Sequence, residues 1–278
     1  MVATPLLSVA GSNPAGLNFD WAFFWHALVR PNSSFLLGFA TTIYISIIAM
    51  ALAIVVGLLL ALGRRSRLWP VRVFVSLYIW VVRGTPLLVQ LVIVYDGFSA
   101  MRLFSFSDVT VLGIDIQGVV QAGIVTLALN EAAYMAEIIR AGIASVGVGQ
   151  SEAGLSLGMT PGQVMRRIVL PQAVRLIVPP LGNDFNAMMK STSLLATIGV
   201  SELFLNAEEI NSLTFRTFEI YSVAALYYLF LTTVWTLVQS TIEARLQSQL
   251  GIPRPPTFRQ RLLGTGWRPA GGRVRDSA

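Results

Sequence analysis

An apolar run over residues 35–62, with no charged side chain, is the clearest pattern along the chain. About 20 apolar residues suffice to cross a bilayer as a helix, so this run predicts a membrane span. Four more spans are predicted at residues 69–98, 119–142, 171–200 and 220–246. In the second, Arg83-Gly84-Thr85-Pro86 interrupts the run, and Pro86 predicts a kink because it lacks a backbone donor. The predicted fold class is an all-α membrane protein with five transmembrane helices.

The two ends of the chain lie outside the predicted spans. Residues 18–30 are aromatic but short and charged, so they predict an interfacial segment instead of a crossing. Prolines, glycines and arginines near the C-terminus predict a flexible basic tail that is attracted to an anionic membrane surface. We therefore divide the chain into an extracytoplasmic or interfacial segment (1–34), a transmembrane domain (35–250) with a cytoplasmic loop (147–171), and a tail (251–278).

The distribution of charge predicts the orientation. Of the 20 lysines and arginines, fifteen fall on one side of a five-span arrangement, three fall on the other, and Arg83 and Lys190 lie within spans. Because basic loops stay in the cytoplasm, we expect the N-terminus outside and the C-terminus inside, in a bacterial inner membrane. A composition of 54% hydrophobic and 12% charged residues excludes an ordinary soluble domain. The net charge is +6, but the basic residues lie beside the predicted spans, so the charge does not indicate nucleic acid binding.

The predicted cytoplasmic loop between the third and fourth spans carries the most informative pattern. It reads as two short helices, the first ended by Gly158 and the second started by a capping box of Thr160 and Gln163. We expect Pro171 to end the second helix and to start the fourth span. Such a rigid element between two spans is suited to carrying force from a cytoplasmic partner into the bundle.

The spacing of this loop resembles the coupling-loop signature of ABC importer permeases, which reads Glu-Ala-Ala, three residues, Gly, nine residues, Ile, any residue, Leu-Pro. Only the third position departs from it, since Gly replaces Ala there. Segments around Arg83–Gln90, Ala133–Arg140 and Pro179–Leu194 are similar to the polar amino acid branch of that family. The matching loop residues are Glu152, Ala153, Gly154, Gly158, Ile168, Leu170 and Pro171.

The resemblance implies a type I importer permease that works with separate chains. A cytoplasmic ABC ATPase dimer would bind Glu152 and its neighbours, and an extracytoplasmic amino-acid-binding protein would deliver the substrate. A second permease subunit, identical or different, would complete the pathway. ATP and Mg²⁺ would then bind to the ATPase, and we expect no cofactor on this chain, whose only lysine follows Met189 and forms no phosphate-binding loop.

Ionisable side chains inside predicted spans are candidates for substrate contact, because each costs at least about 2.5 kcal/mol to insert. Glu131 is the candidate for a substrate ammonium group and Lys190 for its carboxylate. The alternative is a structural ion pair, between these two or with Asp184 or Arg83. For Arg83 the sequence leaves three roles open: shaping the kink, touching the coupling loop, or lining the substrate path.

A polar stripe in the fourth predicted span recurs at steps of three and four residues, which predicts one helical face. This face either lines the pathway or forms hydrogen bonds between helices. We expect Glu137 and Arg140 to pair near the cytoplasmic end of the third span. The stripe consists of Asn183, Asn186, Lys190, Ser193 and Thr197.

Two rival functions remain at this point. An ion-driven secondary amino acid transporter or channel would use Glu131 and Lys190 as its own coupling charges and would need no ATPase. A membrane scaffold would tolerate neutralisation of both residues. The transported solute is also open, because arginine, histidine, glutamine, glutamate, cystine and opines all suit a permease that admits what a binding protein delivers.

Overall fold

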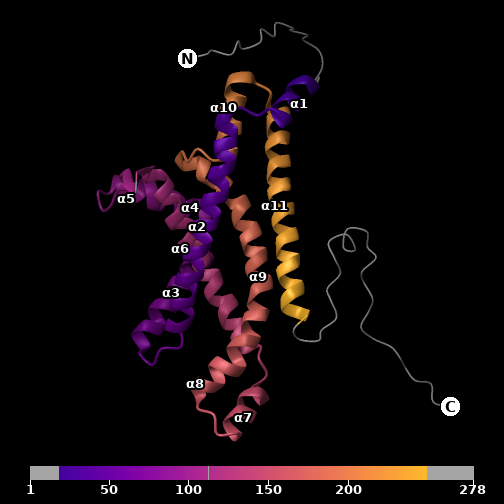
Figure 1. The fold of residues 1–278 in the computed structure, drawn as a ribbon. Helices are drawn as coiled ribbons and strands as arrows, with labels where there is room; N and C mark the ends of the chain where they lie inside the picture. The colour runs from indigo at the N-terminus through magenta and orange to yellow at the C-terminus, as the bar shows by residue number, and fades with distance from the viewer. Residues whose placement is uncertain (1–18, 112, 249–278) are drawn as a thin grey trace, which may run out of the picture.

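The computed structural model describes residues 19–248 except residue 112, and this part is almost entirely helical (Figure 1). The four longest helices are α2 (Ser33–Gly63), α6 (Gly118–Ala144), α9 (Leu170–Ser191) and α11 (Thr217–Ser248). The shorter ones are α1 (Trp21–Val29), α3 (Trp69–Gly84), α4 (Leu87–Val92), α5 (Phe98–Ala100), α7 (Val148–Ser156), α8 (Pro161–Val164) and α10 (Leu203–Thr214). The predicted tail and most of the predicted N-terminal segment lie outside the described residues.

The core of the bundle forms where α2 packs along α6. Small side chains let the two helices approach closely, and Ala49, Ala53 and Ala132 are fully buried. At Gly57 a Cβ atom would lie 2.5 Å from the Cβ of Met135, so a larger residue does not fit without movement. Such close van der Waals packing is what holds helices together in lipid, where burial of apolar surface adds little.

A second cluster joins one end of α2 to α1, α10 and α11, with Phe35, Leu203 and Ile220 buried in it. Close to it lies Glu202, which is fully buried and caps α10 by accepting from the backbone N–H of Leu205 at 2.8 Å. Its carboxylate also accepts from the hydroxyl of Tyr228 at 2.8 Å. Burial raises the pKa of Glu202, and these hydrogen bonds act in the opposite direction.

The predicted kink at Pro86 is a full break of 111° between α3 and the helices that follow. Because proline restricts the residue before it, Thr85 is extended, with φ −119° and ψ 145°. Pro86 then caps α4. As a result α4 and α5 turn away to the side of the molecule (Figure 1). A π-helix, Ile93–Gly97, lies between them.

Among the described residues, α2, α6 and α11 are long and apolar enough to cross a membrane, and the broken pair beginning with α3 makes a fourth span if it is counted as one. α9 was expected to be a span, but it contains Pro179, Pro180 and several polar residues and does not meet the same criterion. The five-span count and the sides of the two termini therefore stay predictions.

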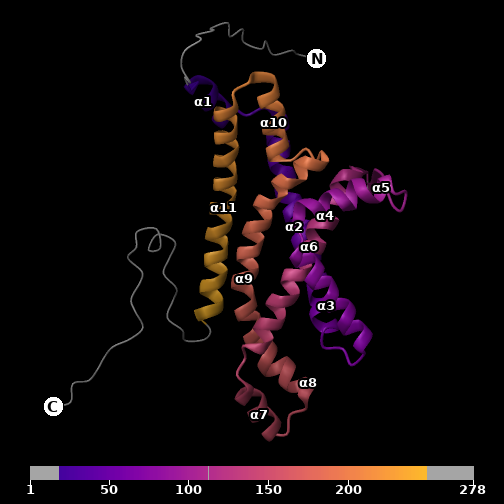
Figure 2. The same ribbon diagram turned by 180° about the vertical axis from the view of Figure 1, so that it is seen from behind.

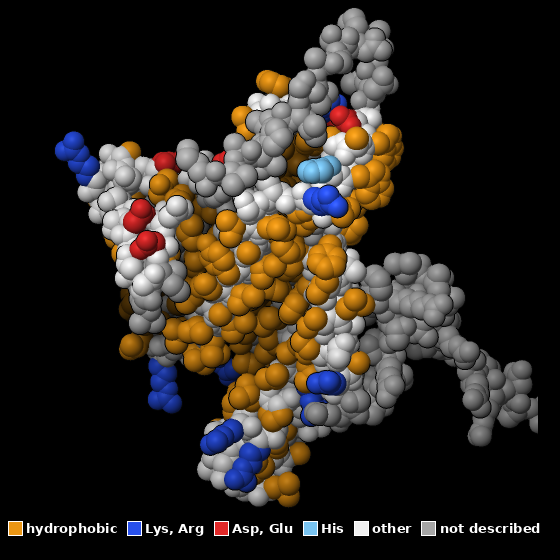
Figure 3. Space-filling model, turned by 45° about the horizontal axis from the view of Figure 1, so that its top comes forward, with side chains coloured by type: hydrophobic (Ala, Val, Ile, Leu, Met, Phe, Trp, Pro, Cys, Tyr) orange, Lys and Arg blue, Asp and Glu red, His pale blue; other side chains and the backbone are white. Residues whose placement is uncertain are grey.

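Two elements were not predicted from the sequence: α10, and a small antiparallel sheet of β1 (Val109–Val111) and β2 (Ile114–Ile116). The outer surface of the bundle is apolar, as expected of a membrane protein, with Leu59, Phe74 and Phe230 among the exposed side chains. Figure 3 shows hydrophobic side chains across the middle of one face, with the acidic side chains in its upper half and most of the basic ones below.

Candidate functional site

Residues 148–170 form the two short helices predicted for the loop. After α7, Gly158 adopts a left-handed φ of +79°, which favours glycine. The backbone N–H of Gln163 donates to the hydroxyl of Thr160 at 3.4 Å, and the backbone N–H of Thr160 donates to the Gln163 side chain at 2.9 Å. The glycine stop and the capping box are both confirmed.

Gly154, the one departure from the coupling signature, is buried where α7 crosses the next helix. A Cβ atom there would lie 2.8 Å from Cδ1 of Ile168 and 3.0 Å from Cγ2 of Val164. Glycine lowers local helix propensity by about 1 kcal/mol relative to alanine. In return it lets α7 pack closely on Ile168, which is itself part of the signature.

The second loop helix does not end at Pro171, as the sequence analysis expected. It continues through a π-helix, Met165–Val169, directly into α9, and the backbone N–H of Leu170 donates to the carbonyl of Met165. A π-turn re-registers the backbone hydrogen bonds, which lets a helix accommodate a proline that lacks a donor. The loop is therefore joined to α9 by continuous helix.

Glu152 and Ala153 are exposed on α7, at the end of the molecule farthest from α1 and α10 (Figures 1 and 2). Apolar side chains beside them, Val148, Leu155 and Leu157, are also exposed, Leu157 by 84%. Exposed apolar residues around a charged one are typical of a surface that binds another protein.

Glu131 lies in the middle of α6 and hydrogen-bonds to Asp184 of α9. Its Oε1 atom is buried and has no hydrogen-bond partner among the described residues. Lys190 is exposed, and no ion pair joins it to an acidic residue in the part of the chain that the structure describes. The contact with Asp184 joins two carboxyl groups and is not an ion pair, and none of the expected ion pairs of Glu131 or Lys190 occurs among the described residues.

The polar stripe predicted for the fourth span is not one helical face. α9 ends at Ser191 and a 3-10 helix, Thr192–Ile198, follows, so the α-helical period stops before Ser193 and Thr197. Both of these hydroxyls bond to nearby backbone carbonyls. Asn183 instead accepts from Gln239 of α11 at 3.2 Å, and Asn186 donates to Thr236 of α11 at 3.4 Å. These two amides link helices.

A side chain that was not predicted from the sequence as functional, Gln90, bridges the α3–α4 break. The amide nitrogen of Gln90 donates to the carbonyl of Val82 at 2.8 Å and to the carbonyl and hydroxyl of Thr85, at 3.2 and 2.8 Å. Its oxygen accepts from the amide of Asn130 on α6 at 3.0 Å. A glutamine one turn beyond a proline, facing an asparagine on an apolar helix, is the signal that could have pointed to this link.

The expected pair of Glu137 and Arg140 is present, with 2.8 Å between Oε2 and the guanidinium. Arg64, at the end of α2, also binds Glu137. Toward the break, the guanidinium of Arg83 stacks over the ring of Tyr134, with 5.2 Å between them. Gly84 ends α3 here, and a Cβ on it would meet nothing within 4 Å.

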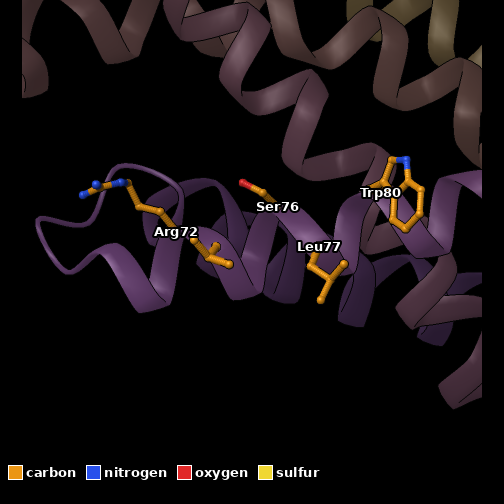
Figure 4. Close-up of a pocket in the computed structure, with 5 residues that line it drawn as sticks. Arg72, Ser76, Leu77 and Trp80 are labelled. Atoms are coloured by element: carbon orange, nitrogen blue, oxygen red, sulfur yellow. The ribbon is translucent and has the colours of Figure 1, made fainter.

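Two open hollows are lined by residues of α3. A cleft of about 420 Å³ between α3 and α6 is lined by Arg64, Arg83, Tyr134, Glu137 and their neighbours, and we call it the α3–α6 cleft. A shallow apolar groove of about 360 Å³ lies along α3 itself, where Ser76, Leu77 and Trp80 line it and Arg72 closes one end (Figure 4). Both hollows share Ser76 and Trp80.

The sequence matches the family model described as the binding-protein-dependent transport system inner membrane component over residues 53–248. The glutamine transport system permease protein GlnP of Escherichia coli (strain K12) is 34% identical over 235 residues, which cover 83% of this chain and 99% of that protein. The octopine transport system permease protein OccM of Rhizobium radiobacter is 39% identical over 227 residues, covering 81% and 89% of the two chains.

Solved structures agree with these matches. An amino acid ABC transporter crystallised with histidines has a TM-score of 0.70 at 38% identity, covering 79% of this chain and 97% of that one. The inward-facing MetNI methionine ABC transporter has a TM-score of 0.56 at 19% identity, covering 82% and 99%, and shows the shared fold alone. The rival reading as a secondary transporter or channel is not favoured by these relatives. The chain belongs to the family of binding-protein-dependent transport system inner membrane components, the permeases of ABC importers.

Proposed function

We propose that this chain is the permease subunit of a bacterial inner-membrane importer for polar amino acids. The observation that carries the proposal is the exposed loop around Glu152, which projects from one end of a bundle with the permease fold. Relatives named for the transport of glutamine, octopine, L-cystine and arginine support the substrate class.

The α7–α8 loop binds the cytoplasmic ATPase dimer in this proposal. Glu152 contributes a charge and Leu155 and Leu157 contribute apolar contacts, so the surface has both the polar and apolar parts of a protein interface. The continuous helix from α8 into α9 supports transmission of ATPase closure to the bundle. ATP and Mg²⁺ bind to the ATPase, and this chain is not itself an enzyme.

At the opposite end, the side of α1 and α10 receives substrate from an extracytoplasmic binding protein. A second permease subunit, identical or different, completes the pathway. The orientation that fits these partners has five crossings, the N-terminus outside and the C-terminus in the cytoplasm, in line with the 15-to-3 bias of basic residues between the two sides.

The ATPase requirement is tested in proteoliposomes that contain the permease with its binding protein, with and without the ATPase. We expect uptake of a radiolabelled polar amino acid only when the ATPase and ATP are both present. Uptake driven by a proton or sodium gradient through the permease alone would overturn the proposal.

The docking role of the loop is tested by Glu152→Lys. We expect at least a tenfold loss of uptake while the ATPase still hydrolyses ATP, because a reversed charge at an interface costs more than its removal. Asp115→Lys reverses another exposed acid, in β2, which the proposal assigns to neither partner, and serves as the matched control. Wild-type uptake in Glu152→Lys would reject the assigned role of the loop.

A further inference from the structure

The α3–α6 cleft contains one arginine, Arg83, for which the described residues provide no carboxylate partner. Two arginines line the cleft, and Arg64 is bound to Glu137, which also holds Arg140. Within the part of the chain that the structure describes, no ion pair involves Arg83, whose guanidinium only stacks on Tyr134. The guanidinium therefore keeps donors for an anion that enters the cleft.

Three observations indicate that the cleft meets water in a pathway instead of lipid. First, its lining includes Arg83, which lies within a predicted span, and charges at membrane depth face a water-filled cavity or the bundle interior. Second, the cleft includes Gly84 at the α3–α4 break, and irregular backbone at membrane depth is tolerated where it lines such a cavity. Third, α6 lines the cleft with two polar side chains, Tyr134 and Glu137.

Glu131 does not itself line the cleft, but on α6 it lies close to Tyr134, which does. Glu131 and Tyr134 are three residues apart on α6, so they are neighbours on the helix surface, about 5–6 Å apart at Cβ. Arg83 lies over the Tyr134 ring, and Glu131 has a buried oxygen without a partner. An amino acid carries its ammonium and its carboxylate on a single carbon, so one molecule could reach both groups.

We propose that Arg83 binds the carboxylate of the transported amino acid in the α3–α6 cleft, while Glu131 takes its ammonium group. Tyr134 holds the guanidinium by stacking and leaves its planar fork of donors free for a bidentate contact. This assignment rests on the proposed function, and it transfers the carboxylate role from Lys190 to Arg83. Lys190 is exposed, and nothing in the structure links it to Glu131.

The proposal is tested by removing the Arg83 guanidinium, the substrate carboxylate, or both. The permease–ATPase complex is placed in nanodiscs, and calorimetry measures the binding of L-glutamine, L-arginine and L-histidine and of their carboxamides. For the wild type we expect at least one amino acid to bind about tenfold or more tightly than its carboxamide, since a charge-assisted hydrogen bond is lost. Arg83→Gln should bind both forms equally weakly, and Arg83→Lys should restore part of the difference.

Arg72→Gln removes the same charge from the same helix outside the α3–α6 cleft and should leave the difference intact. Retained discrimination in Arg83→Gln, with wild-type uptake, would overturn the inference and leave the proposed function standing. Loss of bound phosphatidylglycerol in native mass spectra of Arg83→Gln, with unchanged amino acid affinity, would overturn it too and assign the cleft to lipid. If no amino acid is taken up by the wild-type system, the proposed function itself fails.

Discussion

Glu131 shows how one buried atom can suggest a function. A hydrogen bond between two carboxyl groups needs a proton on one of them, and an ammonium group can take the place of that proton between Glu131 and Asp184. We expect Glu131→Gln to lower uptake by at least tenfold, because an amide can still donate to Asp184 but does not attract a cation. Radiolabelled uptake in proteoliposomes with the full transporter measures the effect.

Glu243→Gln is a suitable control, since Glu243 is a buried acid of α11 that bonds to Gln239 on its own helix. It should keep wild-type uptake. An unchanged apparent affinity for substrate in Glu131→Gln would contradict a role in ammonium binding and would leave the Glu131–Asp184 contact as a link between helices.

Single residues also mark the limit of prediction from sequence. Glu131 stood out because an acid in an apolar run is conspicuous, whereas Asp184 was considered only as a member of an ion pair and not as a second carboxyl group beside Glu131. Lys190 stood out as a charge in a predicted span, yet its side chain is exposed. The sequence could not predict this, because a helical period does not tell which face of α9 packs against α11. Glu202 lies just beyond the fourth predicted span, where the sequence does not indicate burial, and only the packing of α2 and α11 around α10 makes it a buried cap.

At the scale of helices, the caps and ends of helices were predicted well from the sequence, but the angles between helices were not. The capping box of α8 and the glycine after α7 follow from local chemistry and are present as expected. Pro86 predicted an interruption, but the 111° turn depends on where α4 can pack. The π-helix before Pro171 and the 3-10 helix after α9 were missed because tertiary contacts decide such changes of helical period.

The α3–α4 break should depend on Gln90, whose amide satisfies carbonyl groups left open at the end of α3. We expect Gln90→Met, which keeps the length of the side chain, to destabilise the protein by about 1–3 kcal/mol through unpaired polar groups. The thermal unfolding midpoint of the detergent-solubilised protein checks this. As a control, Gln172→Met loses one hydrogen bond within a continuous helix and should lower the midpoint less. Equal midpoints for the two variants would contradict the bridging role of Gln90.

At the scale of the whole molecule, the charge bias and the positions of α7 and α10 give a direct test of orientation. The sequence contains no cysteine, so single cysteines can be introduced without a background. Leu157, after α7, and Leu213, in α10, are matched sites at opposite ends, exposed by 84% and 82%. A membrane-impermeant maleimide should label Leu213→Cys in intact spheroplasts and Leu157→Cys only after permeabilisation. Because basic loops are retained in the cytoplasm, the reverse pattern would mean that the ATPase cannot reach α7, and the proposed coupling would fail with the orientation.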